Sequence, residues 1–229
     1  MRIDFERIDS QRTDLGILSL HRYVAETGET GYEVRIDGAF LMATHGAWGE
    51  IAMVALARAR IDGGVEGLQV LVGGLGAGHT LGAALDRSDV AFVEVVEISS
   101  KVVDWNRRYF TNVHPHGVDD PRVAVVCADL GQVLRERRER YHMILIDVDN
   151  GPGWLAAAAN RDLYGPSGLA ACREALVPGG VAAYWSPQPN SVLRCELDRV
   201  FGNVEQVDTA SLAPQAAGPS DVVLLATRR

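Results

Sequence analysis

Hydrophobic runs and helix-like stretches alternate along most of the chain. From Leu68 onward, the hydrophobic runs are short and rich in Val, Ile and Leu, which is typical of buried parallel strands. They read LQVLVG, VAFVEVVE, VAVVCAD, HMILIDV and VAAYW. Amphipathic stretches such as SKVVDWNRRYF and SGLAACREALV lie between them. Because such alternation is typical of a sheet with helices on both faces, the pattern predicts an α/β fold with a mostly parallel, doubly wound sheet.

A different pattern precedes residue 63. Residues 17–43 form short apolar runs broken by turn signals, among them Asp37-Gly38, a pair that favours tight hairpins. The segment EIAMVALARARI then has helical spacing and ends near Gly63-Gly64. We therefore predict an N-terminal β unit with a linking helix over residues 1–62, and the α/β domain over residues 63–229. The last two apolar segments predict a closing hairpin.

The charge balance narrows the possible partners. The chain has 22 Lys and Arg against 30 Asp and Glu, a net charge of −8. Nucleic acids and anionic membranes recruit basic surfaces, so we predict neither as a partner and favour a small cationic molecule. The absence of a signal-peptide pattern or a long uncharged apolar run predicts a cytoplasmic protein. Three cysteines without CxxC spacing and an isolated His114-Pro115-His116 tripeptide predict no metal site.

A glycine-rich loop is the first candidate binding site. The strand-like LQVLVG runs directly into Gly74, Gly76 and Gly78, and a helix-like stretch follows. Glycines at such a turn let the backbone approach a ligand closely, although many strand-helix turns carry glycines for packing alone. The next strand ends at Glu97, where nucleotide-binding α/β folds place an acid that accepts hydrogen bonds from ribose. No Gly-Lys-Ser/Thr follows, so the sequence predicts a nucleoside without phosphates.

Two further acids follow predicted strands. Asp129 comes after the third strand, where its carboxylate would accept from an adenine amino group or would cap the helix that follows; the sequence leaves both open. Asp147 follows HMILI at the carboxyl end of a parallel strand, which is where open α/β sheets bind their ligands. The alternative for Asp147 is that it only shapes a turn with Asn150-Gly151.

Several of these segments together resemble the spermidine synthase family of aminopropyltransferases. The likeness rests on YEVRIDG, VLVGGLGAGHTL, VEVVEISSKVVDWNRRYF, DDPRVAVVCADL, YHMILIDVDNGPG and LYGPSGLAACREALVPGGV. It implies the Rossmann-like class I methyltransferase fold with a seven-stranded sheet, and a homodimer. It also implies that S-adenosylmethionine or its decarboxylated form is the co-substrate and that a cationic amine is the acceptor.

The chain departs from this family at two acids. The family carries GGGDGG at the glycine loop, and its aspartate, which grips the donor's amino group, is replaced here by Ala77. The family also carries DSxDP, and the position of its second aspartate, which helps to deprotonate the attacking amine, is occupied here by Asn150. Because an amide cannot accept a proton at neutral pH, we expect Asp147 or Asp149 to contact the acceptor, with Asn150 only orienting it.

Three functions remain open at this stage. The first is transfer of an aminopropyl group to an amine with atypical catalytic residues, and the second is methyl transfer from S-adenosylmethionine. The third is a catalytically silent relative that keeps the nucleoside pocket, which the residues at positions 77 and 150 motivate. Trp48 and Trp154 are candidates for the mouth of the pocket, since aromatic faces attract sulfonium and ammonium cations, and core packing is the alternative for each.

Overall fold

The fold consists of two sheets, described in a computed structural model at residues 5–14, 16–25, 28–148, 158–212 and 221–229. The smaller sheet is antiparallel, in the order β1-β2-β3-β4. Its strands are β1 (Glu6–Thr13), β2 (Gly16–Val24), β3 (Thr30–Ile36) and β4 (Ala39–Ala43). Asp37 and Gly38, between β3 and β4, have φ angles of 48° and 84°, as a tight hairpin turn with two left-handed residues requires. The predicted antiparallel β unit is therefore present.

The larger sheet has seven strands in the order β10-β11-β9-β8-β5-β6-β7. Its strands are β5 (Leu68–Gly73), β6 (Val90–Val96), β7 (Val123–Val126), β8 (Tyr141–Ile146), β9 (Leu176–Ser186), β10 (Val204–Asp208) and β11 (Val222–Thr227). The five neighbouring strands β9, β8, β5, β6 and β7 are parallel to one another. By contrast, β11 runs antiparallel to both β9 and β10. The predicted α/β fold with a mostly parallel sheet and a closing hairpin is confirmed.

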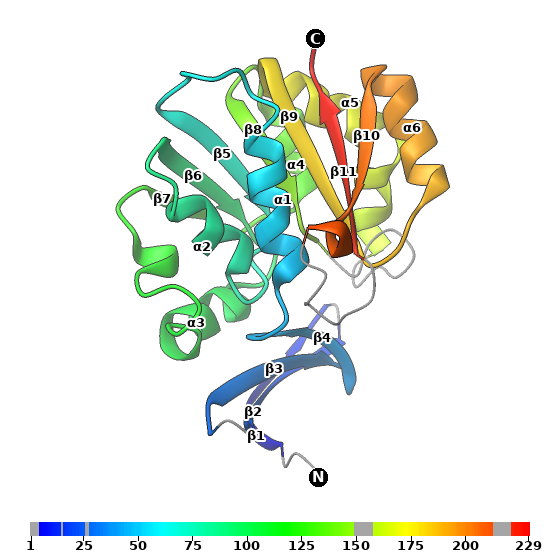
Figure 1. The fold of residues 1–229 in the computed structure, drawn as a ribbon. Helices are drawn as coiled ribbons and strands as arrows, with labels where there is room; N and C mark the ends of the chain where they lie inside the picture. The colour runs from blue at the N-terminus through cyan, green and yellow to red at the C-terminus, as the bar shows by residue number, and fades with distance from the viewer. Residues whose placement is uncertain (1–4, 15, 26–27, 149–157, 213–220) are drawn as a thin grey trace.

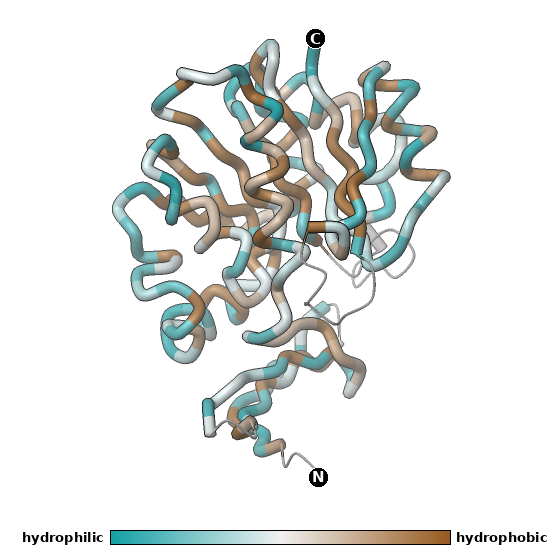
Figure 2. Tube along the Cα trace, in the orientation of Figure 1, coloured by the Kyte–Doolittle hydropathy of each residue, from teal (hydrophilic) through white to brown (hydrophobic). Residues whose placement is uncertain are grey.

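Helices cover both faces of the larger sheet. They are α1 (Trp48–Arg58), α2 (His79–Leu85), α3 (Ser100–Tyr109), α4 (Leu130–Glu136), α5 (Pro166–Ala175) and α6 (Ser191–Phe201), with 3-10 turns η1 (Gly117–Asp119), η2 (Ala158–Tyr164) and η3 (Thr209–Ser211). Figure 1 shows α1 crossing the front of the sheet and the N-terminal sheet lying below its lower edge. In Figure 2 the hydrophobic positions concentrate in the central strands between the helix layers.

The two faces of the sheet build two cores. Met53 and Val54 of α1 share one core with Met143 and Leu145 of β8. Helices α4, α5 and α6 pack on the other face, around residues such as Ile144 of β8. Because α1 joins the core of the large sheet, its first turn is held against one edge of that sheet. Among the described residues, no helix combines the length and apolarity that a membrane crossing requires.

Candidate active site

The glycine loop brings two strand ends into contact. β5 ends at Gly73, and Gly74 has a φ of +88°, a left-handed conformation that glycine adopts without strain. A Cβ atom on Gly74 would lie only 2.3 Å from the backbone oxygen of Asp147. Glycine at this position therefore lets the loop pass directly over the end of β8.

The remainder of the loop is fixed by a side chain of α3. Asn106 Nδ2 donates a hydrogen bond of 2.9 Å to the backbone oxygen of Gly76. A Cβ atom on Gly78, where φ is +92°, would lie 2.8 Å from Asn106 Oδ1. Gly78 immediately precedes α2, so the predicted turn of Gly74, Gly76 and Gly78 between a strand and a helix is present. Their contact with a ligand remains a prediction.

The N-terminal sheet reaches this loop through β4. A Cβ atom on Gly76 would lie 3.6 Å from the sulfur of Met42. His79 Nε2, at the start of α2, lies 3.3 Å from the backbone oxygen of Ala43, to which it donates. Burial lowers the pKa of His79, which favours the neutral ring, although the hydrogen bond to Ala43 acts in the opposite direction. The small sheet thus covers one side of the loop.

Glu97 lies beside the glycine loop, directly after β6. Its Oε2 accepts a hydrogen bond of 3.0 Å from the backbone N–H of Leu75, and its Oε1 accepts one of 2.8 Å from Ser99. Burial raises the pKa of Glu97, and these backbone donors oppose that effect. The carboxylate is therefore oriented at the loop, as a ribose acceptor would need to be.

Asp129 caps α4. Its Oδ1 accepts a hydrogen bond of 2.8 Å from the backbone N–H of Gln132, which is the arrangement of a helix N-cap. The residue follows β7 at the same edge of the sheet as Glu97. One of its two sequence interpretations is thus observed, and the contact with adenine remains a prediction.

Asp147 lies at the end of β8, next to the glycine loop. Its backbone N–H donates to the oxygen of Gly73 over 2.8 Å, and its Oδ2 accepts a hydrogen bond of 2.7 Å from Thr80 Oγ1 on α2. Burial raises the pKa of Asp147 to about 6, although the Thr80 hydroxyl acts in the opposite direction. Asp149, Asn150 and Trp154, which the sequence also singled out, lie outside the described residues.

Glu50 adds a second carboxyl group that the sequence did not assign to the site. It lies in the first turn of α1. Burial, followed by the negative charge of Asp147, raises the pKa of Glu50 to about 8, and Asp221 contributes further. Both carboxyl groups therefore retain a proton to higher pH than ordinary surface acids do.

Asp221 completes the row of acids. It directly precedes β11. Burial raises the pKa of its carboxyl group, and the Trp185 indole partly opposes this effect. Trp48, a sequence candidate for the pocket mouth, is 39% exposed and donates from its indole nitrogen to the backbone oxygen of Thr209 over 3.2 Å. This bond fixes the start of α1 against the turn after β10.

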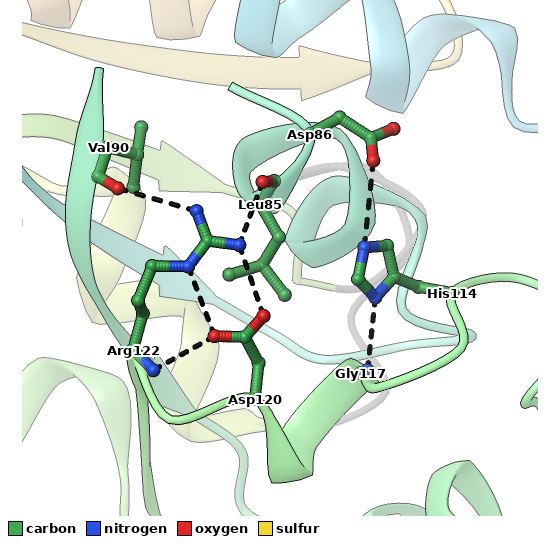
Figure 3. Close-up of polar contacts among 7 residues, drawn as sticks. All are labelled: Leu85, Asp86, Val90, His114, Gly117, Asp120 and Arg122. Atoms are coloured by element: carbon green, nitrogen blue, oxygen red, sulfur yellow. Dashed lines mark hydrogen bonds and ion pairs between the residues drawn. The ribbon is translucent and has the colours of Figure 1, made fainter. Parts of the chain in front are cut away.

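His114, the first residue of the histidine tripeptide, has a packing role. Figure 3 shows its Nδ1 accepting from the backbone N–H of Gly117 and its Nε2 facing Asp86 of the segment after α2. Nearby, Arg122 forms an ion pair with Asp120. These contacts anchor the loop before β7 to the end of α2. No group of three or more metal-ligating side chains occurs within the part of the chain that the structure describes.

The fold and the acidic strand edge define a Rossmann-like α/β protein, and comparison with known proteins gives its family. The family model for the spermine/spermidine synthase domain matches residues 55–205, which is more than half of the chain. The chain belongs to the spermine/spermidine synthase family.

Individual relatives differ in length and in reaction. The chain is 29% identical over 133 residues to a polyamine aminopropyltransferase of Prochlorococcus marinus, covering 58% of this chain and 45% of the relative. It is 31% identical over 113 residues to putrescine N-methyltransferase 2 of Nicotiana attenuata, covering 49% of this chain and 29% of the relative. The chain thus spans half or less of the length of these curated relatives.

A solved spermidine synthase, in complex with the transition-state analogue AdoDATO, shares the fold. It superposes with a TM-score of 0.78 at 19% identity, over 97% of this chain and 74% of that one. The Rossmann-like fold that the resemblance implied is therefore confirmed.

The sequence analysis did not assign Glu50, Thr80 or Asp221 to the site, although Glu50 falls near an acid that the resemblance implies. Glu50 and Asp221 do not follow a parallel strand, so the rule that locates ligands at strand ends does not reach them. Thr80 is the second residue of α2, beyond the glycine loop. The predicted closing hairpin carried a signal for Asp221, because an antiparallel strand brings its beginning to the edge where parallel strands end.

The raised pKa of Glu50 predicts a pH-dependent stability. A carboxyl group with a pKa near 4.5 in the unfolded chain and about 8 in the folded one favours folding in acid, and this contribution is lost as the pH rises through about 8. The free energy of unfolding should therefore fall between pH 5 and pH 8, and Glu50→Gln should flatten the slope. At pH 8 the variant should be more stable by about 2 kcal/mol or more, since each pKa unit corresponds to about 1.4 kcal/mol.

Urea unfolding at four pH values from 5 to 8 measures this difference. Glu66→Gln, at an exposed site, is the matched control and should keep the wild-type slope. A Glu50→Gln slope equal to that of wild type would show that Glu50 ionises normally in the folded protein.

Proposed function

We propose that this protein transfers an aminopropyl group from decarboxylated S-adenosylmethionine to a small cationic amine. The observation that carries the proposal is the Asp147–Glu50 pair, two carboxyl groups with raised pKa values, of which Asp147 lies against the glycine loop. Family membership supports aminopropyl transfer as the reaction class. The negative charge of the chain agrees with a cationic acceptor.

The donor would occupy the side of the sheet formed by β5, β6 and β7. There the glycine loop lies over the strand ends, and Glu97 is oriented by Leu75 and Ser99 to accept from ribose hydroxyls. The loop carries a nonpolar residue, Ala77, where the family has its aspartate. The donor's amino group would then depend on another acid, and Asp147 is adjacent to the loop.

Aminopropyl transfer needs little covalent participation by the protein. The amine nitrogen forms a bond to the carbon attached to the sulfonium, the carbon–sulfur bond breaks, and its electron pair stays on sulfur as a neutral thioether. The attacking amine must first release a proton. A carboxylate with a pKa of about 6, as at Asp147, is still mostly ionised at neutral pH and accepts that proton far better than one near 4; alignment of the reactants supplies much of the remaining rate.

Methyl transfer from S-adenosylmethionine is the second candidate. The relative from Nicotiana attenuata supports it, as does Ala77, which removes the acid that the resemblance assigns to the donor's amino group. In both reactions the acceptor is an amine and the acidic edge has the same role.

The homodimer, the cytoplasmic location and the division at residues 62 and 63 also stay predictions.

Product analysis with each donor tests the proposed function. With decarboxylated S-adenosylmethionine and putrescine we expect methylthioadenosine, and Asp147→Asn should lower kcat by about 10²-fold or more because it removes the proton acceptor. Asp62→Asn, at an exposed position, should leave the rate unchanged. Formation of S-adenosylhomocysteine from S-adenosylmethionine alone would identify a methyltransferase. Nucleoside binding without product from either donor would identify a silent relative.

The donor side has its own prediction. Glu97→Gln should weaken the binding of methylthioadenosine by about 1.5–3 kcal/mol, because it removes a charged acceptor for the ribose hydroxyls. Isothermal titration calorimetry measures this loss. Asp129→Asn, which retains a good helix cap, reports separately on the adenine contact. An unchanged affinity in Glu97→Gln would show that Glu97 does not bind the ribose.

A further inference from the structure

Trp185 stands next to the proposed acceptor site because of the register of three strands. Ile146 of β8 pairs with Tyr184 of β9, so the residues that follow, Asp147 and Trp185, are the next pair along the two strands. Trp185 in turn pairs with Val223 of β11. Side chains at matching positions point to the same face of a sheet. Asp147, Trp185 and Asp221, two residues before Val223, therefore share the face that α1 covers.

The indole of Trp185 occupies the space that a side chain at Gly49 would fill. A Cβ atom on Gly49 would lie 2.4 Å from Trp185 Nε1 and 2.8 Å from Asp221 Oδ2. Gly49 precedes Glu50 in the first turn of α1. The absence of a side chain at Gly49 thus lets the indole reach the start of the helix, where its nitrogen is buried next to the Asp221 carboxyl group.

We propose that Trp185, seated over Gly49, is a specificity-determining wall between Asp147 and Asp221 that limits the length of the amine acceptor. This inference rests on the proposed function. β9 lies between β8 and β11 in the sheet, so the indole rises between the two acids. Strands are about 4.8 Å apart, which puts the end of β8 and the start of β11 about 10 Å from each other.

Removal of the indole would join the two parts of the acidic edge. Asp221 would then be open to a second ammonium group on an acceptor whose first amine lies at Asp147. With the indole in place, a short diamine fits beside Asp147 and a longer one does not; without the indole, the longer chain has room to extend toward Asp221. A shorter side chain at position 185 should therefore favour longer diamines, and this gain should require the charge of Asp221.

The test compares kcat/KM for diamines with three to seven methylene groups. The ratio of kcat/KM for the seven-carbon acceptor to that for the four-carbon acceptor should rise by about tenfold or more in Trp185→Leu. One or two methylene groups change discrimination by a similar factor in a pocket of defined shape. The double variant Trp185→Leu/Asp221→Asn should lose most of that rise. Trp185→Phe, with a smaller ring, should give a smaller shift and carries the test if the leucine variant does not fold.

Tyr184→Phe is the matched control, because it alters the same strand on the opposite face, and it should keep the wild-type length profile. If the Trp185 variants lose kcat/KM equally for every acceptor and keep the length profile, Trp185 does not limit acceptor length. The proposed function would stay intact. A wild-type protein that transfers to no amine would overturn both.

Discussion

The approach of the β5 and β8 ends at Gly74 is the constraint on which the site depends. Because Gly74 has no Cβ, the loop lies against the backbone oxygen of Asp147, where a larger residue would clash. This contact brings the loop that we propose for the nucleoside next to the acid that we propose for the amine. The rest of the site extends from this point, with Glu97 and Asp129 on one side and Asp221 on the other.

Burial of the acids gives this edge its chemistry. Asp147 and Glu50 lose solvation when α1 packs against the sheet, and the negative charge of Asp147 disfavours the ionised form of Glu50. The pair is consequently unstable in its fully ionised form. A cationic ligand would relieve the repulsion, so the same feature that weakens the folded protein at high pH would favour the binding of an amine.

The sequence predicted the parts of the site that follow parallel strands. The glycine loop, Glu97, Asp129 and Asp147 could be located because strand periodicity and strand ends are visible in one dimension. Glu50, Asp221 and Trp185 could not, because their place depends on how α1 crosses the sheet and on the antiparallel direction of β11. The helix-cap contact of Asp129 was one of two open interpretations, and only the fold could show it.

Proton release on amine binding tests most directly whether the buried acids form the acceptor site. Calorimetric titration of putrescine into the protein saturated with methylthioadenosine, repeated in buffers of different ionisation enthalpy at pH 7, gives the number of protons exchanged. The account predicts a net release that is smaller in Glu50→Gln, because the ammonium lowers the raised pKa values of the acids. Putrescine binding with no proton released, or with the same release in Glu50→Gln, would contradict it.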